Sequence, residues 1–212
     1  MSSSARRDFQ GELAEIEAKV MRLFALVSES LAGATDTFLA GDRASALAVA
    51  DHDLIIDELD RDIEHLVQRT LALQAPVATD LRFLVTVLRI VPELERSGDL
   101  AEHIARRAAQ SQGTELSPRL RGIVEQMGVI AGEMWRAVAD AFVDRDAVAV
   151  IRLEEHDQRL NRLRTELYDR LATGEVSCRA AVEMALVGRF YERLGDHAKH
   201  IARRIGYLAL GD

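Results

Sequence analysis

A charged segment of thirteen residues occurs twice in this chain, and it limits the folds that the chain can adopt. The first copy, ERSGDLAEHIARR, spans Glu95–Arg107, and the second, ERLGDHAKHIARR, spans Glu192–Arg204, with ten of the thirteen positions identical. A weaker echo precedes each copy, because DHDLIIDEL at Asp51–Leu59 aligns with EHDQRLNRL at Glu155–Leu163. Repetition on this scale is best explained by a fold made of two related halves.

Apolar residues recur at steps of three and four along most of the chain, which is the spacing of one face of an α-helix. Gly41 can stop the first helix, and Asp42 can cap the second. The segment Ser111–Pro118 is the clearest linker, because Ser117 is a typical N-cap and Pro118 suits the first helical position. The pattern indicates three helices before this linker and three after it.

The sequence therefore predicts an all-α fold of two pseudo-symmetric three-helix bundles, covering residues 1–112 and 113–212. The repeated segment lies in the third helix of each bundle. Pro92 lies inside the first of these helices, and we expect it to kink the helix or to make it restart.

The charge balance restricts the partners of the protein. With 27 basic and 35 acidic residues, the formal net charge is −8, which argues against direct binding to nucleic acid. A single cysteine, Cys178, rules out an internal disulfide framework. No signal peptide is evident, and no apolar run reaches the roughly 18 residues that a membrane span needs. We expect a cytoplasmic protein that reaches the inner face of the membrane only through partners.

Two pairs of carboxylates stand out in the repeated segment. Glu95 and Asp99 in the first copy, and Glu192 and Asp196 in the second, are four residues apart, so each pair shares one helix face. Like charges at this spacing repel, and a glycine between them costs about 1 kcal/mol in a helix interior. A bound cation would offset both costs, since carboxylates are hard oxygen ligands. The alternative is that these acids are solvated and pair with arginines in the same segment.

Further residues could complete such a site. Weaker candidate ligands are His103 and His200 one turn along, and Asp53, Asp57 and Asp157 on the preceding helices, where Asn161 replaces a fourth acid. Fe, Zn, Mn and Mg are all compatible with carboxylate and imidazole ligands.

The segments that carry these acids resemble the PhoU family of phosphate-signalling regulators. The resemblance covers essentially the whole chain and includes the doubled ExxxD motif and a DLR motif at Asp80–Arg82. It implies two three-helix bundles with multinuclear iron or other metal sites on their surfaces. Two departures are visible: many relatives have Asn at His103 and His200, and the second half retains only Arg179 of the DLR motif.

The resemblance also implies a function. PhoU-like proteins repress the phosphate-starvation response by linking the PstB-type ATPase of a phosphate transporter to a PhoR-type sensor kinase. We therefore expect a non-enzymatic, metal-binding adaptor that acts as a negative regulator and could form a homodimer. Candidate partner contacts are Asp80, Arg82 and Arg106.

Two other classes of function compete with this hypothesis. One is a di-metal carboxylate enzyme, which would use Glu-x-x-His motifs on facing helices. No histidine in this chain has Glu three residues before it, which argues against that class. The other is a helical adaptor that binds no metal.

Overall fold

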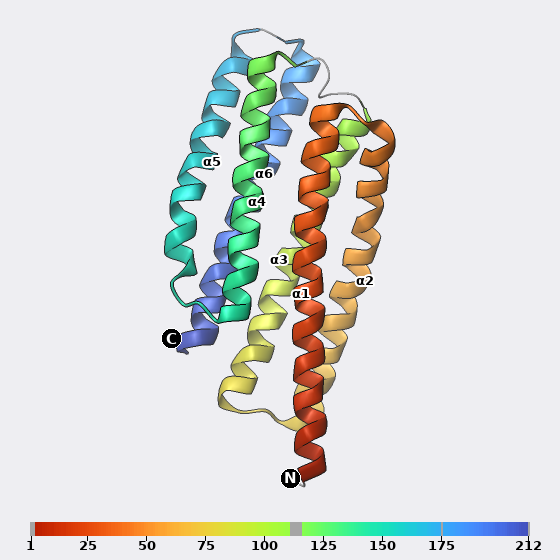
Figure 1. Cartoon of the computed structure of the whole chain (residues 1–212), viewed down its shortest axis with the longest axis vertical. Helices are drawn as coiled ribbons and strands as arrows, with labels where there is room; N and C mark the ends of the chain where they lie inside the picture. Colours follow the sequence, from red (N-terminus) through yellow and green to blue (C-terminus); the bar gives the residue numbers. More distant parts are fainter. Residues whose placement is uncertain (1–2, 111–115, 175, 212) are drawn as a thin grey trace.

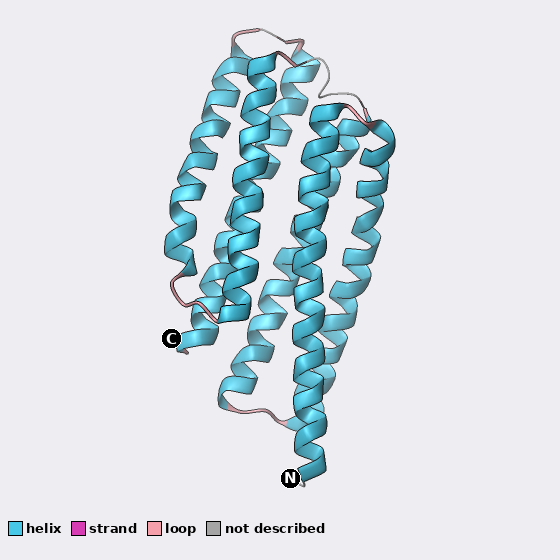
Figure 2. Ribbon diagram, viewed as in Figure 1, coloured by secondary structure: helices cyan, strands magenta, loops and turns pink. Residues whose placement is uncertain are grey.

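The computed structural model describes residues 3–110, 116–174 and 176–211. Within these residues the chain forms six α-helices and no strand, which confirms the all-α prediction (Figure 2). The helices are α1 (Ser3–Ala40), α2 (Arg43–Gln74), α3 (Ala78–Ala109), α4 (Pro118–Asp144), α5 (Ala149–Ala172) and α6 (Cys178–Leu210). The predicted boundary between residues 112 and 113 lies outside the described residues.

The capping residues predicted from the sequence lie at the ends of the helices. Gly41 has a φ of 71° after the end of α1, and the Asp42 carboxylate accepts hydrogen bonds from the backbone N–H groups of Ala44 and Ser45 at 3.1 and 3.2 Å. Ser117 accepts from the N–H of Leu120 at 3.4 Å, and Pro118 is the first residue of α4. Local chemistry therefore sets these helix limits.

The helices form two bundles that lie side by side (Figure 1). α1, α2 and α3 pack against one another, as do α4, α5 and α6, and the bundles meet where α3 contacts α6 and α1 contacts α4. The centre of the seam between α1 and α4 is aromatic: the Phe24 ring lies 6.4 Å from the Trp135 ring and 5.6 Å from the Phe142 ring. One hydrophobic core therefore runs through both bundles.

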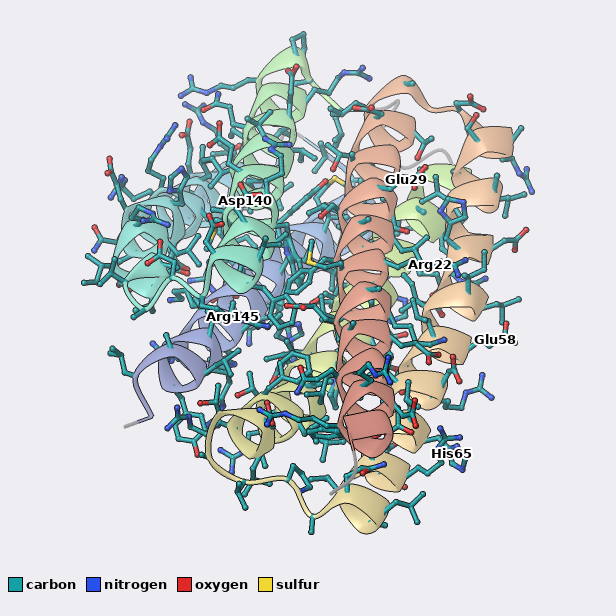
Figure 3. The ribbon with its side chains drawn as sticks, turned by 60° about the horizontal axis from the view of Figure 1, so that its bottom comes forward. Arg22, Glu29, Glu58, His65, Asp140 and Arg145 are labelled. Atoms are coloured by element: carbon teal, nitrogen blue, oxygen red, sulfur yellow. The ribbon has the colours of Figure 1, made fainter. Side chains whose placement is uncertain are left out.

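Arg145 directly follows the last residue of α4 (Figure 3) and contacts side chains of the first bundle. Its guanidinium carbon lies 4.9 Å from the centre of the Phe142 ring and 5.1 Å from that of Phe83, which belongs to α3. The guanidinium also donates to the carboxylate of Glu17 on α1. The Arg145 guanidinium thus links the two bundles both by stacking on aromatic rings and by pairing with a carboxylate.

α3 continues through Pro92 without interruption. The sequence predicts a kink or a restart at this residue, and the helix does not restart. Pro92 is exposed, so water can satisfy the Leu88 carbonyl that proline leaves without an N–H partner.

The glycines of the repeated segment allow close helix packing. A Cβ atom on Gly98 would lie 2.8 Å from the Ile56 side chain on α2, and one on Gly195 would lie 2.9 Å from the Leu160 side chain on α5. Both distances are too short for a real contact, so a larger residue would force the Ile56 or the Leu160 side chain to move. The glycine therefore has a packing role that is the same in both halves.

The sequence predicts no membrane span, but one stretch of α1 is apolar enough to meet the criteria for one. The region Arg6–Ala40 contains a window with a mean hydropathy of 1.2, which by length and composition alone is enough for a membrane span. Half of that window is buried inside the protein, where α1 contacts α2, α3 and α4. Burial against three helices accounts for its apolar character.

Candidate functional site

The acids of the repeated segments lie against the second helix of each bundle, but the charges of the residues around them differ between the two bundles. In the first bundle, acids from α2 and α3 gather without enough positive charge to balance them. This α2–α3 acidic cluster consists of Asp53, Asp57, Asp60, Glu95, Asp99 and Glu102. It brings together the predicted pair Glu95 and Asp99 with the predicted Asp53 and Asp57.

Repulsion and burial perturb the protonation of this cluster. Burial, followed by the charges of Asp99 and Asp60, raises the pKa of Glu95 from 4.5 to about 7. Burial, then Asp99 and Glu102, raises the pKa of Asp53 from 3.8 to about 6. Glu95 is therefore partly protonated near neutral pH, where an ordinary glutamate would be fully ionised.

The cluster contains a buried acceptor that no donor satisfies. The Oδ1 atom of Asp53 is shielded from solvent and has no hydrogen-bond partner among the described residues, which is also true of Oδ1 of its counterpart Asp157, but only Asp157 has a cation on its other oxygen. Arg106 Nε donates to the Glu102 carboxylate at 2.7 Å, while the charges of Arg61 and Arg96 act to lower the pKa of Asp60 and Glu95. These arginines do not balance the cluster, because burial and the neighbouring acids still raise the pKa of both Asp60 and Glu95.

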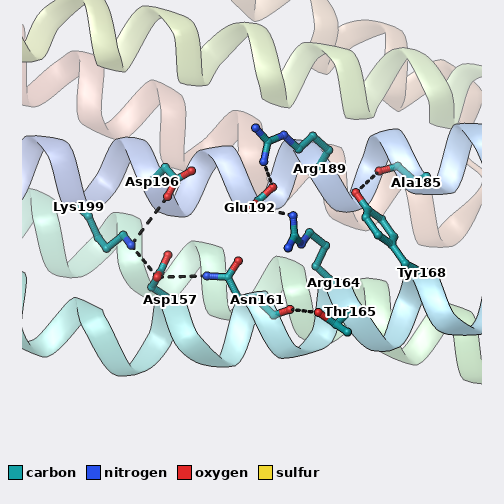
Figure 4. Close-up of polar contacts among 10 residues, drawn as sticks. All are labelled: Asp157, Asn161, Arg164, Thr165, Tyr168, Ala185, Arg189, Glu192, Asp196 and Lys199. Carbon is teal, nitrogen blue, oxygen red and sulfur yellow. Dashed lines mark hydrogen bonds and ion pairs between the residues drawn. The ribbon is translucent and has the colours of Figure 1, made fainter.

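In the second bundle the equivalent acids are held in ion pairs, which we call the α5–α6 ion-pair network (Figure 4). Arg164 Nη1 lies 2.8 Å from Glu192 Oε1, and Arg189 donates to the other oxygen of the same carboxylate. Lys199 Nζ lies 2.6 Å from Asp157 Oδ2, which also accepts from Asn161 at 3.2 Å. Lys199 is 3.8 Å from Asp196 as well.

Two residues missed by the sequence reasoning cause this difference. Arg164 occupies the position that Asp60 holds in the first half, and Lys199 occupies the position of Glu102. Lys199 is one of only three positions at which the two copies of the repeated segment differ. The signal for an unequal pair of sites was therefore present in the sequence.

The residues at the other two positions where the repeated segments differ face each other at the seam between α3 and α6. Ser97 and His197 stand where the opposite copies have Leu194 and Leu100, and Ser97 Oγ lies 2.9 Å from His197 Nδ1. Burial lowers the pKa of His197 to about 4, although Glu93 opposes this effect. His197 is therefore neutral at neutral pH and serves as a packing group between the bundles.

The remaining candidate residues are spread over the surface. His103 borders the acidic cluster, where its ring packs on Phe190 at 5.5 Å, whereas His200 lies in a groove beside arginines. Arg82 donates to Thr79 near the start of α3, and Arg106 lies near its other end. The structure does not bring the predicted partner residues Asp80, Arg82 and Arg106 together.

The two bundles differ in how well they fit a metal ion. Throughout the described ranges, no three carboxylate, imidazole or thiol groups converge closely enough to hold an ion as the side chains lie. The α2–α3 acidic cluster nevertheless has suitable chemistry, with hard oxygen donors, excess negative charge and the unpartnered oxygen of Asp53. The α5–α6 network does not fit, because its acids already have internal cations.

Comparison with known proteins identifies the family. The family model of the PhoU domain matches the chain twice, over residues 20–108 and 124–205. The chain belongs to the PhoU family. The two PhoU matches fall on the two bundles, and the interval between them contains the predicted linker.

Relatives agree along almost the whole length. The chain is 31% identical over 210 residues to phosphate-specific transport system accessory protein PhoU homolog 1 of Mycobacterium leprae, covering 97% of this chain and 94% of that one. It is 30% identical over 216 residues to a PhoU homolog of Caulobacter vibrioides, covering 100% and 94%. Proteins with these names are accessory components of a phosphate-specific transport system.

Solved PhoU structures share the fold. The crystal structure of PhoU from Pseudomonas aeruginosa superimposes with a TM-score of 0.89 at 29% identity and covers 96% of this chain and 100% of its own. The phosphate transport system regulatory protein PhoU from Streptococcus pneumoniae gives a TM-score of 0.87 at 26% identity, covering 96% and 98%. The fold expected from the resemblance is confirmed.

Proposed function

We propose that this protein is a negative regulator of the phosphate-starvation response, which couples a PstB-type transporter ATPase to a PhoR-type sensor kinase. Membership of the PhoU family and the names of the relatives support this role. The single observation that carries it is the pair of matched but unequally charged faces, one on α2 and α3 and one on α5 and α6. Two such faces suit a bridge between two different proteins.

The mechanism is one of selective docking. An adaptor shifts the activity of a kinase only if it binds one of the kinase's states more tightly than another, and the shift is limited by that difference in affinity. Binding to the transporter and kinase would hold the protein at the inner face of the membrane. Exposed side chains such as Arg106 are suited to such contacts, because their substitution does not disturb the core.

A deletion strain tests the regulatory role. We expect phosphate-starvation genes to be expressed even when phosphate is abundant, and the wild-type gene to restore repression. Pull-down with the cytoplasmic portion of the kinase and with the ATPase tests the contacts, with Arg106→Ala expected to weaken one of them. Normal regulation in the deletion strain, together with no binding to either partner, would contradict the proposal and favour an enzyme or an unrelated adaptor.

We further propose that a metal cation binds at the α2–α3 acidic cluster and not at the α5–α6 ion-pair network. Asp53, Asp57, Glu95 and Asp99 would hold it, with His103 at the edge. The cation would supply the positive charge that Arg164 and Lys199 supply in the second bundle. Carboxylate oxygens favour hard ions such as Mg, Mn or Fe over softer ones, and Zn remains compatible if His103 takes part.

Elemental analysis of matched variants tests the metal. The variant Asp53→Asn/Glu95→Gln/Asp99→Asn should lose bound metal. Its control, Asp157→Asn/Glu192→Gln/Asp196→Asn, should retain the metal content of the wild type. Circular dichroism checks that both are folded. A metal-free wild type, or equal metal in the first variant and the wild type, would support the adaptor without metal instead.

A further inference from the structure

A basic groove lies between α3 and α6, where the two bundles meet. It contains a hollow of about 610 Å³ beside Arg89, Arg96, Arg203 and Arg204, and an adjoining hollow of about 330 Å³ beside Arg96, Arg189 and Arg193. The two hollows adjoin, because they share Arg96, Glu93 and His200, and Asp196 also lines the second; together they are here called the arginine groove. Six arginines thus converge on one feature of a chain whose net charge is −8.

Most of this positive charge has no partner in the part of the chain that the structure describes. Arg89, Arg193, Arg203 and Arg204 make no ion pair or hydrogen bond to any other described residue. Of the remaining two, Arg96 lies 2.7 Å from Glu93, and Arg189 pairs with Glu192. Among the described residues, the groove therefore holds six guanidinium groups against two lining acids, Glu93 and Asp196, and four of the six make no ion pair.

The other repeat shows that these arginines need not be unpaired. Arg106 is the counterpart of Arg203, and its guanidinium lies 2.5 Å from Glu102. Arg107 is the counterpart of Arg204; it lies 2.9 Å from Glu183 and stacks 4.8 Å above the Phe190 ring. The first repeat thus contains the same two arginines with their charges satisfied.

The acids that satisfy the first pair are missing in the second. Lys199 occupies the place of Glu102, so Arg203 has a cation instead of a carboxylate one turn before it. Thr86, which is buried, occupies the place equivalent to Glu183, so Arg204 lacks its acid too. Two separate replacements therefore leave the same groove positive.

The chemistry and the size of the groove indicate the ligand. The planar fork of a guanidinium matches the oxygens of a phosphoryl group and donates two hydrogen bonds to it. Arg193 and Arg204 are eleven residues apart on α6, or roughly 16 Å at the rise of an α-helix. A single tetrahedral anion cannot contact charges spread over that length, and the hollow is large enough for a small organic ligand.

We propose that the arginine groove binds a small anion that carries two or more phosphoryl groups. Condensed inorganic phosphates and nucleotides share this chemistry. The ligand would sit between α3 and α6 and so would touch both bundles at their seam. The inference is independent of the metal proposal, because the groove lies on different side chains.

Isothermal titration calorimetry on the full chain tests this proposal. The protein is titrated with tripolyphosphate, ATP, inorganic phosphate and sulfate at constant ionic strength, in a chelator so that metal plays no part. We expect tripolyphosphate or ATP to bind, and inorganic phosphate and sulfate to bind at least about tenfold more weakly. The better of the first two identifies the ligand as a condensed phosphate or a nucleotide.

Two matched variants separate the groove from general surface charge. Arg203→Gln and Arg106→Gln each remove one exposed arginine from an equivalent position of the two repeats, so both should remain folded. We expect Arg203→Gln to weaken binding of the polyphosphate by about tenfold and Arg106→Gln to leave it unchanged.

Several results would overturn the proposal. These are no heat of binding with either polyphosphate, equal affinity for inorganic phosphate, and equal weakening by both variants. A poly-glutamate peptide that binds more tightly than tripolyphosphate would assign the groove to an acidic partner protein, which also contradicts the proposal.

Discussion

Replacing Glu95 with glutamine should stabilise the metal-free protein at about pH 8. Burial and neighbouring acids raise the pKa of Glu95 from 4.5 to about 7, so above this pH the native state holds an ionised carboxylate against repulsion. A shift of this size corresponds to roughly 3 kcal/mol if the charge is unscreened. Glu95 is partly exposed, and solvent screening reduces the expected gain to about 1 kcal/mol.

The effect should depend on pH in one direction. Between pH 4.5 and about 7, the native protein binds more protons at Glu95 than the unfolded chain does, so the free energy of unfolding falls as the pH rises. Glutamine does not titrate. The advantage of Glu95→Gln over the wild type should therefore be greatest near pH 8 and vanish near pH 4.5.

Urea unfolding in the presence of a chelator, followed by circular dichroism, measures this difference, and Glu192→Gln is the matched control. Glu192 accepts from Arg164 at 2.8 Å and from Arg189, so losing its charge should cost about 1–3 kcal/mol. The reasoning is refuted if Glu95→Gln destabilises the protein near pH 8, or if its effect is the same at both pH values. Either result would mean that Glu95 supports the fold.

Three further substitutions test the seam between the bundles. The free energy of unfolding of His197→Leu should rise relative to that of the wild type as the pH falls from 6.5 towards 4, because the folded wild type resists protonation of its buried imidazole. We expect a relative gain on the order of 1–3 kcal/mol in urea unfolding. A difference that does not depend on pH would contradict this reasoning. Gly128→Ala should lower the melting temperature, since its Cβ would lie 2.4 Å from the Thr35 side chain, whereas Gly122→Ala on the same helix has open space and should stabilise by about 0.5–1 kcal/mol. Tyr191→Phe removes a buried hydroxyl that donates to Thr35 at 2.8 Å and should cost about 1 kcal/mol; an unchanged melting temperature would show that this bond contributes nothing.

Much of the fold could be predicted from the sequence because it depends on local chemistry. Periodic apolar residues set the six helices, and Asp42 and Ser117 cap helices where their side chains predict that they should. At Pro92 the sequence predicts a kink or a restart, and α3 does not restart there. Whether a proline interrupts a helix depends on what can satisfy the freed carbonyl. That in turn depends on exposure, which the sequence does not state.

The candidate site was predicted in part. Helical spacing placed Glu95 with Asp99, and the echo on the preceding helix added Asp53 and Asp57, all of which belong to one acidic cluster. The same spacing treated Glu192 and Asp196 as an equivalent pair. It could not show that Arg164 reaches Glu192 from α5, because a period along one helix says nothing about which side chain of another helix faces it.

The sequence by itself determined the duplication, the helical class, the capping residues and the face on which each acid lies, because these follow from spacing within a single helix. Tertiary structure decided which charges meet. Packing of α2 on α3 leaves acids facing acids, packing of α5 on α6 pairs them with Arg164 and Lys199, and packing of α3 on α6 joins Ser97 to His197 and gathers the unpaired arginines. Electrostatic energy depends on distance through space, and only the packing of the helices sets those distances.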